Sequence, residues 1–157
     1  MSVATKLRRL RLRLINLYPP YLGAGIRVTE IAPDFRAVRV QMRLGFFNRN
    51  YVGTHFGGSL YSMCDPFFML MVLENLGGRY IVWDKEARIR FLRPGRGTVQ
   101  ARFSLSGDEL EALRAAADRD GKAERVFSVD VTDEAGRIVA RVDKRIYVRR
   151  KDARART

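Results

Sequence analysis

The chain has 157 residues, of which 46% are hydrophobic, and a formal net charge of +13. This length and composition predict one folded domain over residues 1–157 and exclude a disordered chain. One cysteine excludes an internal disulfide, and with only one histidine beside it we expect no metal site.

The first predicted element is an N-terminal helix within residues 1–20, strongest over residues 5–18. Leucines recur at helical spacing along this segment, and arginines occupy most of the opposite side. We expect Pro19-Pro20 to end the helix. Two strands follow, over residues 25–31 and 36–44, with a turn at Pro33-Asp34.

A polar loop over residues 45–56 leads into the longest apolar segment of the chain. Residues 59–76 are apolar on nearly every side of a helix, so this helix must be enclosed by other elements. Two more strands are predicted at 80–92 and 98–105. Ser106 and Glu109 have the spacing of a capping box, which should open a helix through Ala117 with Gly121 beyond its end.

The last predicted elements are strands at 126–132 and 137–148, joined by a turn at 133–136. The basic tail, residues 149–157, is expected to fray. Enclosing the apolar helix with about six antiparallel strands is the most economical arrangement, and it predicts an α+β fold with the N-terminal helix added to it.

The scarce residue types cluster between Asn50 and Asp65. This segment contains the only histidine, the only cysteine and a glycine pair, Gly57-Gly58, at the predicted start of the apolar helix. Free backbone N–H groups at a helix start can polarise a carbonyl group. Asp65, which lies within the apolar helix, is costly to bury without a partner or a chemical role.

These residues resemble a motif of hotdog-fold acyl-CoA thioesterases of the 4-hydroxybenzoyl and phenylacetate type. That motif reads Asn-x-x-Gly-x-x-His-Gly-Gly, with an acidic residue seven positions after the second glycine. Residues 89–94, Ile-Arg-Phe-Leu-Arg-Pro, resemble a strand end of the same proteins. The chain departs from the motif because Phe56 precedes the glycine pair and His55 lies one position earlier. The matching residues are Asn50, Gly53, Gly57, Gly58 and Asp65.

The resemblance implies a hotdog fold and hydrolysis of an acyl-CoA thioester. In that reading the amides of Gly57 and Gly58 form the oxyanion hole and Asp65 acts as general base or nucleophile. Asn50 would orient the thioester or the water. No cofactor is expected beyond the coenzyme A of the substrate. The substrate-binding candidates are His55, Phe56, Ser59, Asp84, Arg93 and Arg96.

Each of these residues also has a structural interpretation. Asp65 before Pro66 would serve equally as a helix cap, in which case the apolar helix would break there. Asn50 and His55 would serve to hold the loop. Asp84 would form a buried ion pair with Lys85. We interpret Cys64 as a core residue because no histidine lies at a helix-compatible spacing from it.

The spacing of the motif predicts a shared site. Gly58 and Asp65 would lie about 10 Å apart along one helix, too far to act on the same carbonyl group. We therefore expect Asp65 to come from a second subunit, in a homodimer with two shared sites. The resemblance implies the same assembly, with a dimer of dimers as a further possibility.

Two other functions remain open. His55-Phe56-x-Gly58 resembles a dehydratase motif, but Met69 occupies the position where dehydratases have glutamate. A non-catalytic protein that binds acyl-CoA is the other alternative. The charge favours an anionic ligand, since residues 1–60 contain 10 basic and 2 acidic residues, but no nucleic-acid motif accompanies it. With no apolar run long enough to span a membrane and no secretory signal, we expect a cytoplasmic protein.

Overall fold

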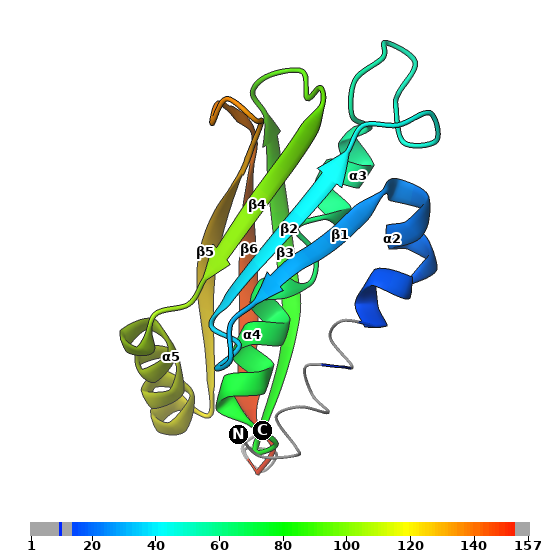
Figure 1. The fold of residues 1–157 in the computed structure, drawn as a ribbon. Helices are drawn as coiled ribbons and strands as arrows, with labels where there is room; N and C mark the ends of the chain where they lie inside the picture. Colours follow the sequence, from blue (N-terminus) through cyan, green and yellow to red (C-terminus); the bar gives the residue numbers. More distant parts are fainter. Residues whose placement is uncertain (1–9, 11–13, 153–157) are drawn as a thin grey trace.

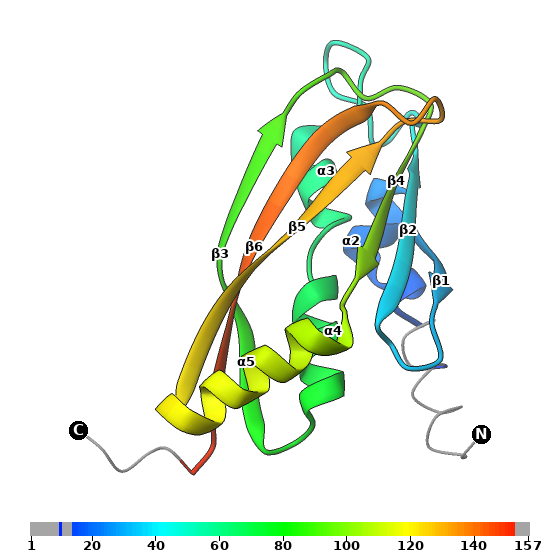
Figure 2. The same cartoon turned by 90° about the vertical axis from the view of Figure 1, so that its left-hand side faces the viewer.

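The computed structural model describes residue 10 and residues 14–152 (Figure 1). Six antiparallel strands form one sheet in the order β1-β2-β4-β5-β6-β3. The sheet curls around two central helices, α3 and α4 (Figure 2). The elements are η1 (Leu14–Leu17), α2 (Pro19–Ala24), β1 (Ile26–Ile31), β2 (Ala37–Arg43), α3 (Gly57–Ser62), α4 (Phe67–Leu76), β3 (Tyr80–Phe91), β4 (Thr98–Ser104), α5 (Gly107–Asp120), β5 (Lys122–Thr132) and β6 (Ile138–Arg150).

The alternating sequence of the strands determines which side of the sheet faces the helices. In β2, Val38, Val40 and Met42 are buried, whereas the residues between them are partly or fully exposed. The inner face packs on the apolar side chains of α4. Phe68 of α4 lies with its ring centroid 5.2 Å from Phe103 of β4 and 5.1 Å from Phe127 of β5. The predicted α+β architecture is confirmed.

The apolar helix is divided in two. Met63 caps α3 and α4 begins at Phe67, so the chain changes direction across Cys64, Asp65 and Pro66. Pro66 lacks the N–H that a continuous helix would use, and the peptide bond before it is cis. The break that the structural alternative for Asp65 predicted is therefore observed, but Asp65 is not the cap, because Pro66 is the N-cap of α4 and no side chain caps it.

The prediction that Pro19-Pro20 ends a helix is wrong. The two prolines begin α2, where the missing N–H groups cost nothing because the first turn of a helix does not use them. Residues 14–17 form a 3-10 turn, and Tyr18 is the N-cap of α2. The rest of the predicted helix, except Leu10, lies outside the described residues.

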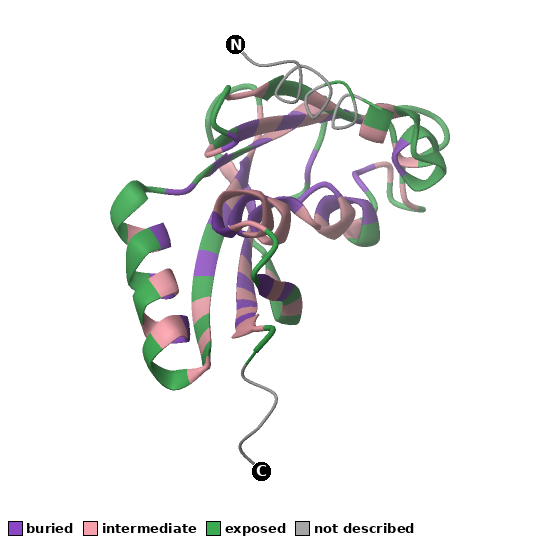
Figure 3. Cartoon of the chain, turned by 90° about the horizontal axis from the view of Figure 1, so that it is seen from below, coloured by how far each residue is buried: buried purple, intermediate pink, exposed green. Residues whose placement is uncertain are grey.

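The capping box at Ser106 and Glu109 is confirmed, with both reciprocal hydrogen bonds present. Helix α5 packs one side on the sheet and exposes the other (Figure 3). It runs to Asp120 instead of ending at Ala117, and Gly121 caps it at φ 76°. Strand β5 therefore starts at Lys122, four residues earlier than predicted.

Strand β6 also extends further than predicted and includes Arg149 and Arg150, which were assigned to a frayed tail. Arg150 is held by ion pairs with Asp118 and Asp152. Residues 153–157 lie outside the described residues. None of the described helices is long and apolar enough to cross a membrane.

Candidate functional site

Asp65 lies at the break between α3 and α4 with 42% of its side chain exposed. Its neighbour Cys64 is fully buried, which confirms the interpretation of Cys64 as a core residue, and burial raises the pKa of its thiol to about 12. The break thus directs two adjacent side chains to different environments. A continuous, enclosed helix would have left the Asp65 carboxylate much less accessible.

A buried lysine holds the Asp65 carboxylate. The side chain of Lys144, on β6, is only 1% exposed, and its Nζ atom lies 2.5 Å from Oδ1 of Asp65. The same Nζ atom lies 3.1 Å from Oδ2 of Asp84 and donates a hydrogen bond of 2.9 Å to the Tyr61 hydroxyl. Burying an ammonium group is costly, and these partners offset that cost.

Burial and neighbouring groups shift the pKa values of Lys144 and Asp84. Burial alone would lower the pKa of Lys144, but hydrogen bonds to Asp65 and Tyr61 outweigh it and raise the pKa above its usual range. The pKa of Asp84 is raised, first by burial and then by the nearby Asp65, although Lys144 opposes this shift. Lys144 is therefore an ammonium ion at neutral pH, which favours the ionised form of a neighbouring carboxylate.

The N-terminal segment forms one wall of the space beside Asp65. The Tyr21 hydroxyl donates a hydrogen bond to the Asp65 backbone carbonyl, and burial together with the nearby carboxylate raises the pKa of Tyr21. A cavity of about 450 Å³ opens there. Apart from Ser62 and Asp65, its lining consists of apolar and tyrosine side chains. The lining residues are Ile15, Tyr18, Pro20, Tyr21, Ser62, Asp65 and Pro66.

A separate cleft of about 530 Å³ is lined by several of the other predicted site residues. It is lined by Gly57 at the start of α3 and by the turn between β3 and β4. Asp65 does not line this cleft, so one chain presents the glycine and the carboxylate to different spaces. The predicted site residues that line it are Asn50, His55, Gly57, Arg93 and Arg96.

The glycine pair begins α3, as the motif predicts. The N–H groups of Gly57 and Gly58 have no acceptor among the described residues, as expected in the first turn of a helix. A Cβ atom at Gly57 would lie 3.0 Å from the Phe91 ring, and one at Gly58 would lie 2.5 Å from the Phe56 ring. Both rings are more than half exposed, so glycine lets exposed aromatic side chains lie over the helix start.

Asn50 and His55 hold the loop that leads to α3. The side-chain carbonyl of Asn50 accepts hydrogen bonds from the Val52 and Thr54 amides. Nε2 of His55 lies 3.0 Å from the Gly97 carbonyl oxygen and must carry the hydrogen, because a carbonyl only accepts. Burial lowers the pKa of His55, partly opposed by this bond, so the ring is neutral at pH 7.

The remaining candidates are dispersed. Ser59 is buried at 8% exposure, and Phe56 is exposed beside Gly58. Arg93 donates a hydrogen bond to the Ile138 carbonyl. The predicted pair of Asp84 and Lys85 is wrong, because a β-bulge after Asp84 places Lys85 against Glu124.

The interpretation of the sequence missed Lys144, although a signal for it exists. In β6 the buried residues alternate, and Lys144 falls in phase with Val142, Ile146 and Val148. A lysine at an inward position of a strand requires buried acceptors. That criterion would have linked Lys144 to the two carboxylates that interrupt apolar segments, Asp65 and Asp84.

One family model matches most of the chain. A family model described as a domain of unknown function, DUF4442, matches residues 8–148. The chain belongs to the DUF4442 family. No curated protein matches the sequence of this DUF4442 protein.

Solved structures resemble this DUF4442 protein over most of its length. A Pseudomonas aeruginosa protein described as a "Probable Thioesterase" has a TM-score of 0.79 at 24% identity and covers 91% of this chain and 95% of its own. A thioesterase from Haemophilus influenzae has a TM-score of 0.65 at 15% identity, and the match covers 88% of each chain. A mutant form of the phenylacetic acid degradation protein PaaI of Thermus thermophilus has a TM-score of 0.57 at 24% identity. The match covers 82% of this chain and 97% of the PaaI chain. The DUF4442 protein therefore has the hotdog fold, which confirms the predicted resemblance.

Proposed function

We propose that the protein hydrolyses acyl-CoA thioesters with Asp65 as the reacting carboxylate. The observation that carries the proposal is the contact between Asp65 and Lys144. A half-exposed carboxylate, held by a buried ammonium 2.5 Å away, faces a largely apolar cavity. The names of the thioesterase structures with this fold support the reaction class.

Lys144 engages Oδ1 of Asp65, which leaves Oδ2 for chemistry. Oδ2 either removes a proton from the attacking water or attacks the thioester carbonyl itself. In both routes the C–S bond breaks and coenzyme A leaves as the thiolate; in the second, water then hydrolyses the anhydride of Asp65 and the acyl group. A single turnover in H₂¹⁸O leaves the label in the Asp65 carboxylate if Asp65 attacks and water opens the anhydride at the Asp65 carbonyl. Label in the product acid results from direct attack of water or from opening of the anhydride at the acyl carbonyl.

The oxyanion would be stabilised by the amides of Gly57 and Gly58 from a second subunit. Two observations support this arrangement. Gly57 and Asp65 line different cavities of one chain. The 12-residue strand β3 is an edge of the sheet, with Trp83 and Phe91 more than half exposed on it, and its unpaired backbone groups can pair with another copy. We therefore propose a two-fold homodimer, which could associate further as a dimer of dimers.

The coenzyme A phosphates would bind at the rim of the Gly57 cleft. Arg93 and Arg96 both line this cleft, and neither forms an ion pair with any described residue. The guanidinium of Arg93 is directed by its hydrogen bond to Ile138, whereas Arg96 is exposed. Unpaired guanidinium groups are the side chains best suited to phosphate oxygens.

A panel of acyl-CoA substrates tests the proposal, with wild type compared with Asp65→Asn. We expect kcat to fall by about a hundredfold or more, since general acid–base groups contribute 10²–10⁴-fold. Asp120→Asn, an exposed aspartate at the end of α5, is the matched control and should leave turnover unchanged. Equal turnover in wild type and Asp65→Asn would contradict the mechanism, and acyl-CoA binding without turnover would support a binding protein instead.

A further inference from the structure

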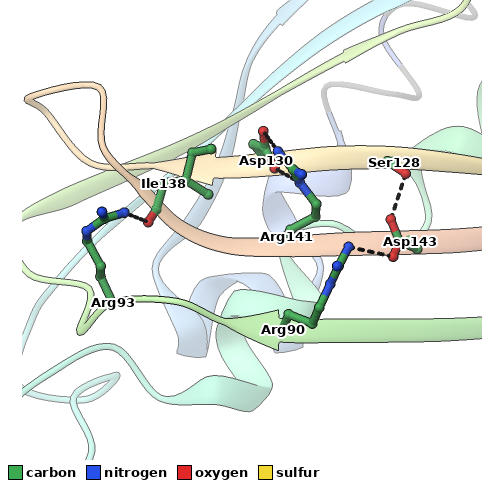
Figure 4. A network of polar contacts seen from close by, with 7 residues as sticks. All are labelled: Arg90, Arg93, Ser128, Asp130, Ile138, Arg141 and Asp143. Carbon is green, nitrogen blue, oxygen red and sulfur yellow. Dashed lines mark hydrogen bonds and ion pairs between the residues drawn. The ribbon is translucent and has the colours of Figure 1, made fainter.

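The outer face of the sheet, opposite the central helices, has two halves of different charge. On β3, β5 and β6, arginines are paired with carboxylates (Figure 4). Arg141 makes two hydrogen bonds to Asp130, of 2.5 and 2.7 Å. Arg90 lies 3.0 Å from Asp143, which also accepts a hydrogen bond from Ser128. In this half of the face, Arg90 and Arg141 are neutralised by carboxylates of the protein itself.

On β1, β2 and β4, three of the four arginines lack such partners. Arg27, Arg43 and Arg102 are exposed, and none of the described residues forms an ion pair or hydrogen bond with their guanidinium groups. Arg39 lies directly opposite Arg102 in the register of β2 and β4. Its carboxylate partner is Glu30, at 3.3 Å. Like charges directly opposite each other destabilise a sheet, so this half would gain stability from a bound anion.

The uncompensated half contains a hollow of about 630 Å³, which we call the arginine hollow. Arg27 is opposite Gln41 in the register and Arg43 is opposite Thr98, so all four side chains extend from the same face. Arg27 and Arg43 are diagonal neighbours, about 7–8 Å apart at their Cα atoms, close enough for both to contact one anion. The lining contains no carboxylate: Gly25, Arg27, Gln41, Arg43, Leu44, Gly45 and Thr98.

We propose that the arginine hollow binds a phosphate group of a soluble phosphate compound such as a polyphosphate or nucleotide. Two guanidinium groups carry the positive charge that offsets a phosphate, and each can donate two parallel hydrogen bonds to its oxygen atoms. The amide of Gln41 and the hydroxyl of Thr98 add neutral donors at the same place. The proposal does not depend on thioester hydrolysis, since none of these residues belongs to the proposed catalytic site.

Calorimetric titration of the full chain with inorganic pyrophosphate tests the proposal. We expect saturable binding to wild type and at least about tenfold weaker binding to Arg27→Gln/Arg43→Gln, since a hydrogen bond to a charged group contributes about 1.5–3 kcal/mol. The matched control is Arg90→Gln/Arg141→Gln, which removes the same charge from two ion-paired arginines of the compensated half of the same face. Its affinity should remain within about twofold of wild type, apart from the long-range charge effect.

An anionic lipid headgroup offers the same phosphate chemistry, so a second arm uses phosphatidylcholine vesicles with and without phosphatidic acid. Binding to pyrophosphate in solution supports a soluble ligand, and loss of both kinds of binding in Arg27→Gln/Arg43→Gln supports one site for phosphate from either source. Equal weakening by the two double variants would show attraction by net charge and overturn the proposal. The absence of saturable binding to wild type in both arms would overturn it as well. Circular dichroism confirms that the compared variants are folded.

Discussion

The Nζ atom of Lys144 lies 2.5 Å from Oδ1 of Asp65, although 79 residues separate the two in the chain. The contact joins the last strand of the sheet to the break between the central helices. Lys144 is buried in this contact, whereas Asp65 remains accessible because it lies at the break before Pro66.

Replacing Lys144 with methionine should destabilise the fold. The substitution leaves Asp84 partly buried without its counter-charge, and breaking a buried ion pair from one side costs about 3–5 kcal/mol. Because Asp65 is 42% exposed, we expect a value nearer about 2–3 kcal/mol for this site. Urea unfolding measures the decrease in the free energy of unfolding. The double variant Lys144→Met/Asp84→Asn should recover part of it, and full additivity of the two changes would contradict the contact.

His55 should make stability depend on pH below neutrality. Its pKa in the folded state is lowered from 6.5 because the ring is buried, so the unfolded chain binds the proton more readily. The stability that His55 contributes is complete above pH 6.5 and is lost as the pH falls through its folded pKa. The protein has one histidine, so a single NMR titration measures that pKa. His55→Gln should remove this part of the pH dependence, and an NMR value above 6.5 would contradict the burial argument.

Mixing two inactive variants tests the shared site. Asp65→Asn lacks the carboxylate and Gly57→Val blocks the helix start, where an added Cβ atom would lie 3.0 Å from the Phe91 ring. In a dimer with shared sites, a heterodimer contains one intact site of two. A mixture in equal amounts should therefore recover about a quarter of wild-type activity after subunit exchange. No recovery, although native mass spectrometry detects heterodimers, would place both residues of a site on one chain.

The sequence predicted the elements whose signals are local. Alternation in β2, the box at Ser106 and Glu109, and the turn ending at Gly136 each depend on residues within a few positions of one another. The prediction was wrong at Pro19, because proline stops a helix from inside but favours its first turn. Which of these roles applies depends on the packing of the flanking segments, and no local pattern reports that.

The candidate site was predicted in part. The glycine pair at a helix start follows from the order of residues around Gly57, and the cleft containing Asn50 and His55 follows from the same loop. Lys85 was predicted to be the ion-pair partner of Asp84 because it is the adjacent basic residue in the sequence. The β-bulge after Asp84 separates the two and leaves Asp84 to the buried ammonium.

By itself the sequence determined the α+β class and the position of the apolar helix, since hydrophobic periodicity is set by neighbouring residues. The tertiary structure alone decided which charges meet. Lys144 has no local feature that selects Asp65 or Asp84, because their proximity results from the register of β3 on β6 and from the direction that the chain takes at Pro66. Long-range contacts of this kind depend on how whole elements pack, and a local pattern does not contain that information.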